Sequence, residues 1–273
     1  MQKRILFASD LDNTLLFSHR HAAPGDVCVE WLDGEKQGFF SPRTIELLRI
    51  VAARATFVPV TTRSVAQYER IRWPQGCQPR LAVTTNGAVL LTRPTDGNAS
   101  GGGAASADRS GSFVRDTAWD DALRPVLAAA HDELLALCAA HADDARYRIC
   151  RMVDDAYLFL RPEDDDRCAA LAAEVATETA LPIAASGRKL YVLPRGLDKG
   201  SALARLRART GATLVLAAGD SAMDAPLLAA AGRAFTLPGL AQPGAETFRE
   251  PDARAARFAE WTLERVLDAI ARA

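Results

Sequence analysis

Four short apolar segments, each followed by polar or charged residues, constrain this chain most strongly. They are residues 5–8, within a strand predicted over 4–9, and residues 55–60, 81–83 and 214–217. An apolar run without polar alternation is typical of a parallel strand that is covered on both faces. Open α/β sheets place their chemistry at the carboxyl ends of such strands. The expected fold class is therefore α/β, with a Rossmann-like parallel sheet as its core.

The first of these segments ends in two carboxylates that lie two residues apart, Asp10 and Asp12. Neighbouring carboxylates repel each other unless a cation neutralises them. The pair therefore predicts a hard divalent metal ion, and Mg²⁺ suits oxygen ligands best. The alternative is an Asp-rich turn after a strand, which is a common arrangement in proteins.

Composition sets limits on location and partners. The chain has 273 residues, which favours about two domains, and its net charge of -1 gives no field that would attract nucleic acid or a membrane surface. No apolar stretch reaches the length that spans a bilayer, and the run after Met1–Arg4 is too short for a secretory signal. The five cysteines are scattered without CxxC spacing, which is typical of reduced thiols. We expect a cytoplasmic protein.

The order of the expected elements indicates an inserted domain. A hairpin over residues 27–40 turns at Asp33-Gly34, and a helix begins at Ser41-Pro42. Farther along, a helix (118–141), a hairpin (146–160), a helix (164–179) and a strand (188–193) form a separate α+β set. We predict a core over 1–87 and 190–273 and a cap domain over 88–189. The glycine-rich segment 97–103 is interpreted as either a cap loop or a substrate gate.

Four groups of polar residues follow predicted strands or begin a helix, and their types suit phosphoryl transfer. They are Asp10 and Asp12, Thr61 to Arg63, Lys199, and Asp220 and Asp224. One carboxylate can act as a nucleophile towards phosphorus, and a second can move a proton to or from the reacting oxygen. A hydroxyl and a lysine can hold the phosphoryl oxygens, while a metal ion offsets the repulsion between phosphate and carboxylate.

These groups also resemble the motifs of one protein family. Residues 10–14 (DLDNT), Thr61, Lys199 within 196–200 (GLDKG) and residues 219–224 (GDSAMD) occur in the order found in the haloacid dehalogenase (HAD) superfamily. The insertion between the second and third motifs resembles subfamily IIB, the Cof-like and sucrose-phosphatase-like enzymes with a C2-type cap. Residues 85–88 (TNGA) resemble that subgroup as well. The resemblance implies a HAD core with an inserted α/β cap.

The resemblance further implies roles for individual residues. Asp10 would be the nucleophile that forms an aspartyl-phosphate, and Asp12 would be the general acid and base. Thr61 would hydrogen-bond the phosphoryl group, and Lys199 would neutralise Asp10 and the phosphoryl oxygens. The implied Mg²⁺ ligands are Asp10, Asp12 through its carbonyl, Asp220, and Asp224 directly or through water. The implied substrate-binding residues are Thr62, Arg63 and Asn86.

We therefore expect a Mg²⁺-dependent phosphatase that hydrolyses a small phosphomonoester, with a sugar or polyol phosphate as the class that the resemblance favours. A nucleotide-like phosphate stays open. One alternative is a phosphotransferase or phosphomutase that uses the same intermediate. Another is a non-catalytic protein that senses a phosphorylated ligand.

Several charged residues of the predicted cap allow two interpretations. Arg146 and Arg148 share one face of a strand, so they could reach an anionic substrate or belong to a solvated face. Arg188 and Lys189, near the junction with the core, allow the same two interpretations. The acidic run 163–166 could hold a cation, but it suits the first turn of a helix better.

Overall fold

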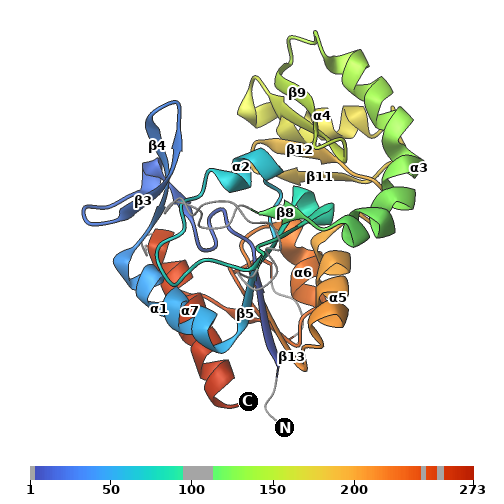
Figure 1. The fold of residues 1–273 in the computed structure, drawn as a ribbon. Coiled ribbons are helices and arrows are strands. Elements are labelled where there is room, and N and C mark those ends of the chain that lie inside the picture. The colour runs from blue at the N-terminus through green and yellow to red at the C-terminus, as the bar shows by residue number, and fades with distance from the viewer. Residues whose placement is uncertain (1–3, 95–112, 241–243, 251–254) are drawn as a thin grey trace, which may run out of the picture.

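The computed structural model describes residues 4–94, 113–240, 244–250 and 255–273, and the glycine-rich segment 97–103 lies outside them. A lower unit is built around a parallel sheet, and an upper unit is built around an antiparallel sheet (Figure 1). A hairpin projects beside the upper unit, with the short helix α2 (Val65–Glu69) between them (Figure 1). Among the described residues, no helix combines the length and the apolar character that a membrane crossing requires.

The lower sheet has five parallel strands in the order β15-β14-β13-β1-β5. They are β1 (Ile5–Ser9), β5 (Thr56–Pro59), β13 (Leu214–Gly219), β14 (Arg233–Thr236) and β15 (Glu246–Thr247). A parallel bridge between Val60 and Val83 connects β5 to β6 (Leu81–Thr84), which pairs with β7 (Val89–Thr92) and through it with β8 (Val114–Arg115). The predicted α/β fold class is confirmed.

Helices cover both faces of this sheet because alternate side chains of a strand point in opposite directions. The helices are α1 (Pro42–Arg54), α5 (Lys199–Thr210), α6 (Ala225–Ala229) and α7 (Ala255–Ala271). Phe7 packs in the hydrophobic cluster that includes α1 and α7, whereas Leu6 and Ala8 pack in the cluster that includes α5 and α6. Burial on both sides explains why β1 is apolar without alternation.

The predicted hairpin is present as β3 (Val27–Leu32) and β4 (Glu35–Phe40), and β4 also pairs with β2 (Phe17–Ser18). Asp33 and Gly34 both have positive φ, at 51° and 82°, which is the conformation that a tight Asp-Gly hairpin turn requires. The short helix η1 (His19–His21) follows β2.

The upper unit, which we call the cap unit, comprises α3 (Thr117–His141) through β12 (Lys189–Val192). Its antiparallel sheet has the order β11-β12-β10-β9. The other strands and helices are β9 (Tyr147–Val153), β10 (Tyr157–Pro162), η3 (Asp165–Arg167), α4 (Cys168–Val175) and β11 (Ile183–Ser186). Leucines of α3 and α4 pack with Leu158, Leu160 and Leu190 of the sheet. The division at residues 88 and 190 stays a prediction.

Two features of the cap unit differ from the sequence prediction. The helix expected over 164–179 is shorter, because the Asp164 side chain accepts a hydrogen bond from Asp166 N and caps the separate turn η3. At the other end, the Thr177 hydroxyl donates to the Glu174 carbonyl where the helix stops. Strand β11 was not predicted, since its sequence (IAAS) has little β-branched character.

The turn between β9 and β10 fastens the cap unit to the core. Asp154 Oδ2 accepts a hydrogen bond from Val65 N at the start of α2 (2.9 Å) and another from the Thr85 hydroxyl. The Tyr157 hydroxyl donates to the Thr62 carbonyl oxygen over 2.6 Å. Since Thr62 lies among the predicted site residues, these bonds hold the cap sheet directly above the carboxyl ends of the core strands.

Candidate active site

The candidate site begins where β1 and β13 end side by side. Ser9 is paired with Ala218 in the parallel register, so the residues that follow, Asp10 and Gly219-Asp220, leave the sheet at the same edge. Asp10 N continues the ladder by donating to the Ala218 carbonyl over 2.9 Å. The sheet thereby brings together carboxylates that are 210 positions apart in the chain.

Asp10, Asp220 and Asp224 form a cluster in which one carboxylate oxygen of each lies within 4.8 Å of the others. The Thr14 hydroxyl lies 3.3 Å from Asp10 Oδ2 and 3.2 Å from Asp220 Oδ1. Burial, together with the neighbouring carboxylates, raises the pKa of Asp10 well above its usual range despite the proximity of Lys199. Burial and Asp224 raise the pKa of Asp220 to about 6. A hard, all-oxygen donor set under such repulsion is suited to a divalent cation.

Lys199 lies beside these carboxylates at the first position of α5. Its Nζ donates to Asp10 Oδ1 over 2.6 Å and to Asp224 Oδ1 over 2.5 Å, and the residue is only 1% exposed. Burial alone would lower the pKa of Lys199, but the two carboxylates outweigh burial and raise it, so the ammonium stays charged. A Cβ at Gly200 would lie 2.4 Å from the Pro226 carbonyl oxygen, so a glycine is needed for α5 to approach α6 this closely.

Asp224 is fixed through both of its carboxylate oxygens. Oδ1 accepts from Lys199, whereas Oδ2 accepts from Asp220 N (3.2 Å), Ser221 N (3.0 Å) and the Ser221 hydroxyl (2.8 Å). A Cβ at Gly219 would lie 2.3 Å from the Asp224 Cβ, so only glycine leaves room for this side chain. Asp224 therefore positions both Lys199 and the loop that carries Asp220.

We expect Lys199→Met to lower the free energy of unfolding of the metal-free protein at neutral pH by about 3–5 kcal/mol, because it leaves two buried carboxylates without their cation. Urea unfolding checks this expectation, with Lys36→Met, an exposed lysine on β4, as the matched control. Added Mg²⁺ should recover part of the loss. Equal stability of the two variants would contradict the assigned electrostatic role.

The raised pKa values of Asp10 and Asp220 also predict how metal binding depends on pH. Below about pH 6, Mg²⁺ has to displace a proton from Asp220, so its affinity should fall by about tenfold for each pH unit. The same raised pKa means that the metal-free protein loses stability as pH rises from about 4 to about 6. Calorimetric titration with Mg²⁺ between pH 5 and pH 7.5 measures the affinity, and Asp220→Asn should flatten the dependence. Equal affinity across this range in the unsubstituted protein would contradict the prediction.

Asp12 lies above the cluster, with a side chain that is 40% exposed, and forms a two-bond ion pair with Arg63. Arg63 Nε donates to Asp12 Oδ2 over 2.9 Å, and Nη2 donates to Oδ1 over 2.7 Å. Burial alone would raise the pKa of Asp12, but the charge and hydrogen bonds of Arg63 outweigh it and lower the pKa. In this arrangement Asp12 is an ionised carboxylate, which is the state that a general base requires.

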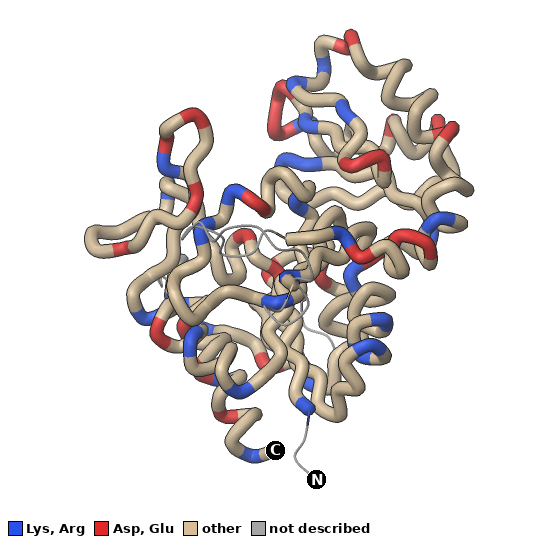
Figure 2. The backbone as a smooth tube through the Cα atoms, in the orientation of Figure 1, with Lys and Arg blue, Asp and Glu red and all other residues tan. Residues whose placement is uncertain are grey.

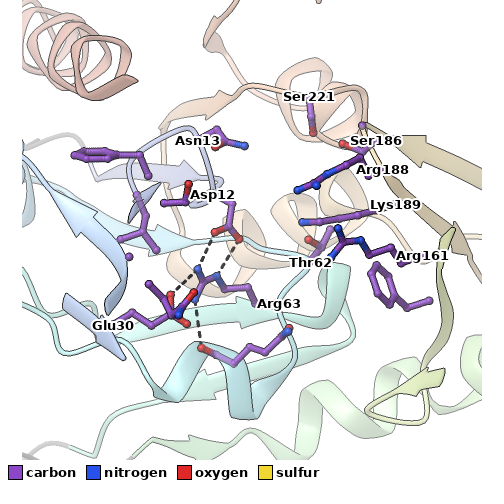
Figure 3. A pocket seen from close by; sticks show the side chains of 18 of the residues that line it. Asp12, Asn13, Glu30, Thr62, Arg63, Arg161, Ser186, Arg188, Lys189 and Ser221 are labelled. Atoms are coloured by element: carbon purple, nitrogen blue, oxygen red, sulfur yellow. Dashed lines mark hydrogen bonds and ion pairs between the residues drawn. The ribbon is translucent and has the colours of Figure 1, made fainter. Parts of the chain in front are cut away.

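Glu30 of β3 holds the other side of Arg63, and sequence reasoning missed it. It is 2% exposed and accepts from Arg63 Nη2 (2.9 Å) and from Arg70 Nε (3.1 Å), as Figure 3 shows for the pair with Arg63. Its partner in the hairpin is Gly38, where a Cβ would lie 3.0 Å from Glu30 Oε2. The sequence signal that could have identified Glu30 is a glutamate that lies opposite a glycine in the predicted hairpin. The hairpin thus orients Arg63, and Arg63 orients Asp12.

The remaining predicted residues fall into two groups. Thr61 is buried, and its hydroxyl oxygen accepts from Arg63 N over 3.2 Å, whereas Thr62 borders the open space above the cluster. Asn86 is buried in the short helix that follows β6. Its backbone N donates to the Thr61 carbonyl oxygen over 2.9 Å, and its side-chain nitrogen donates to the Leu197 carbonyl oxygen over 3.4 Å. The structure therefore brings Arg63 against Asp12 and Thr62 to the cavity wall, whereas neither Thr61 nor Asn86 is among the residues that line the cavity.

A cavity of about 810 Å³ lies between the core, the hairpin and the cap unit. Asp12 and Asp220 line its floor, with Asp10, Lys199 and Asp224 beneath them. The cap unit contributes cationic residues to the opposite wall, among them Arg161, Arg188 and Lys189 (Figure 3). The volume lies within the range of small-molecule sites.

Arg146 and Arg148 do not line this cavity. Arg146 pairs with Asp144 and Glu174, and Arg148 pairs with Glu163. The solvated-face interpretation therefore describes these two arginines. For Arg188 and Lys189 the structure favours the other interpretation, since both border the cavity.

Comparisons with solved structures find proteins of the same fold. A sucrose-phosphatase from Synechocystis, solved with sucrose and phosphate, matches 100% of this chain and 98% of its own, with a TM-score of 0.57 and 17% identity. A protein of Thermoplasma acidophilum matches 97% and 99%, with a TM-score of 0.59 and 12% identity. The C-terminal domain of the trehalose-6-phosphate phosphatase of C. albicans matches 98% and 93%, with a TM-score of 0.54 and 13% identity. No family model and no curated protein matches the sequence.

The chain thus has the fold of these solved structures, and the resemblance seen in the motifs is confirmed at the level of the fold. The likeness extends over nearly the whole length of each of these solved chains, of which the third is a C-terminal domain.

Proposed function

We propose that this protein is a Mg²⁺-dependent phosphatase that hydrolyses a small phosphomonoester, of the sugar or polyol phosphate kind, through an aspartyl-phosphate on Asp10. One observation carries the proposal: a buried lysine ammonium lies 2.6 Å from Asp10 within a cluster of carboxylates at the floor of a capped cavity. Asp10, Asp220 and Asp224, with the Asp12 carbonyl, would hold the metal ion. When bound, Mg²⁺ supplies positive charge that offsets the repulsion between the phosphate dianion and the carboxylates.

In the first step, a carboxylate oxygen of Asp10 forms a bond to phosphorus while the bond to the alcohol oxygen breaks. Asp12 gives the departing oxygen its proton, for which the carboxyl must be protonated and its pair with Arg63 loosened. Lys199 neutralises Asp10 and the phosphoryl oxygens, and the Thr61 hydroxyl, whose oxygen accepts from Arg63 N, can donate its proton to the same group.

In the second step, Asp12 takes a proton from water, and that water attacks the phosphorus of the aspartyl-phosphate. The released phosphate leaves Asp10 as a carboxylate again. The ion pair between Arg63 and Asp12 supports this step, because it favours the ionised carboxylate that acts as the base.

The cap unit would exclude bulk water and large substrates from the cavity. The bonds from Asp154 and Tyr157 to the core support this role, and we propose that residues 88–189 act as the cap domain. A small-molecule partner and a cytoplasmic location belong to the same proposal. The free thiols of all five cysteines are consistent with a reducing compartment.

The test is phosphate release from a panel of sugar, polyol and nucleotide monophosphates, with Mg²⁺ and with a chelator. Mg²⁺-dependent release supports the phosphatase. Turnover in water labelled with heavy oxygen separates the alternatives, because hydrolysis places label in the released phosphate, whereas transfer to a second alcohol does not. Binding of a phosphorylated compound by the folded, Mg²⁺-loaded protein without any turnover would favour a sensor and contradict the proposal.

A further inference from the structure

The cap unit presents four cationic side chains to the cavity from three strands and one turn. They are Arg151 on β9, Arg161 on β10, Arg188 in the turn before β12, and Lys189 at the start of β12. In Figure 3, Arg161, Arg188 and Lys189 lie close together on the side of the cavity opposite Arg63. Figure 2 shows Lys and Arg positions along the edge of the cap unit towards the β3–β4 hairpin, with Asp and Glu positions beside them.

Among the residues that the structure describes, these four side chains share one carboxylate partner, Asp165. Arg188 Nη1 donates to Asp165 Oδ2 over 3.0 Å, and Arg161 Nη2 lies 3.9 Å from Asp165 Oδ1. The Nε of Arg161 is buried without a hydrogen-bond partner. Within the described part of the chain, Lys189 forms no ion pair, and Arg151 contacts the ring of Phe159 rather than an acid. The cap wall of the cavity therefore carries uncompensated positive charge.

The excess charge is specific to the cavity wall. Arg148 lies on the same strand as Arg151, and Arg146 directly precedes that strand; both lie outside the cavity, and each has a carboxylate partner. On the core side, Arg63 and Arg70 line the cavity as well, but both are paired with Glu30. The cap side of the cavity thus carries four cations with one carboxylate between them, whereas Arg146 and Arg148 outside it each have a carboxylate of their own.

The position of these cations relative to the carboxylate cluster indicates which part of a substrate they would meet. Strand β11 contacts the short helix η4 (Ala222–Asp224), so the Ser186–Lys189 turn lies next to Ser221 at the cavity edge (Figure 3). The phosphoryl group that reacts at Asp10 already has Lys199 and the metal ligands beneath it. The cap cations line the wall above this floor, where they would meet a part of the substrate other than the reacting phosphoryl group, and Lys189 also lies near enough to Asp12 for its charge to lower the pKa of that carboxyl.

We propose that the substrate carries a second acidic group, a carboxylate or a second phosphate, which Arg188 and Lys189 bind. This inference rests on the proposed phosphatase function and narrows its substrate class. An arginine guanidinium and a lysine ammonium suit such an anion, and their field would also attract it to the cavity. A neutral sugar end would leave Lys189 without an anionic partner and Arg188 with Asp165 alone.

Two matched pairs of compounds test the proposal and separate the two anions. Glycerate 3-phosphate and glycerol 3-phosphate differ by a carboxylate, whereas fructose 1,6-bisphosphate and fructose 6-phosphate differ by a phosphate. We expect kcat/KM to favour the acidic member of at least one pair by about tenfold or more. Lys189→Gln and Arg188→Gln should each reduce that preference by about tenfold, mainly through KM. Arg148→Gln, on the same sheet but outside the cavity, should leave the preference and the activity unchanged.

The outcomes distinguish this inference from the proposed function. Turnover without preference for either acidic compound, or a preference that neither cap variant reduces, overturns the inference and leaves the phosphatase intact. Absence of turnover with every phosphomonoester overturns the proposed function. In that case calorimetric binding of the same pairs to the Mg²⁺-loaded protein decides the inference: tighter binding of an acidic member that Lys189→Gln weakens supports it, and equal binding of both members overturns it.

Discussion

Asp10→Asn is expected to abolish phosphate release while the protein remains folded. The amide has the shape of the carboxylate, but its weakly nucleophilic nitrogen and oxygen cannot form the aspartyl-phosphate, and it removes one negative charge from the metal cluster. We expect kcat to fall by at least about 10³-fold, as is typical when a covalent nucleophile is lost. Phosphate release under saturating Mg²⁺ and substrate measures the effect.

Folding of the Asp10→Asn variant has to be established separately, because Asp10 Oδ1 is a partner of buried Lys199. Circular dichroism and urea unfolding show whether the variant keeps the native state. Asp143→Asn, at an exposed position of the cap unit, is the matched control and should keep full activity. Substantial activity of folded Asp10→Asn would remove Asp10 from the nucleophile's role.

Asp12→Ala is expected to lower kcat by about 10²–10⁴-fold, the usual cost of losing a general acid and base. The variant should fold, because the Asp12 side chain is 40% exposed and Arg63 keeps its buried partner Glu30. The loss should be smaller with p-nitrophenyl phosphate, whose leaving group needs less help from a proton donor. The measurement is kcat for an alkyl phosphate and for this aryl phosphate.

The comparison of the alkyl and aryl phosphates also shows which results would contradict the role assigned to Asp12. An unchanged rate with the alkyl phosphate would mean that another group supplies the proton. An equal loss with both substrates would mean that Asp12 acts in the hydrolysis of the aspartyl-phosphate alone. Asp26→Ala, in the loop before β3, is a second aspartate whose removal should not change kcat.

The strands that carry the carboxylates could be predicted because their signals are local. The apolar run before Asp10 and the run before Gly219-Asp220 each identify a buried strand without reference to the rest of the chain. Parallel strands then place their carboxyl ends together, so the cluster of Asp10 and Asp220 follows from topology. The Asp33-Gly34 hairpin could be predicted for the same reason, since its turn type selects those residues.

Contacts between distant segments could not be predicted from these signals. Glu30 and Arg63 are 33 positions apart, and only the packing of the hairpin on the core brings them together. In the sequence Asp154 is typical of a turn residue. Its hydrogen bond from Val65 N depends on how the cap unit is oriented on the core, which no local pattern indicates. Strands as short and weakly patterned as β11 likewise depend on their neighbours.

The most direct test of the central claim is acid quenching of wild-type protein during turnover, followed by mass spectrometry of its peptides. The account predicts that the peptide containing Asp10 gains the mass of one phosphoryl group when Mg²⁺ is present and loses it as phosphate appears. Phosphate release with a phosphoryl group on a different residue, or with none on any peptide at any quench time, would contradict it.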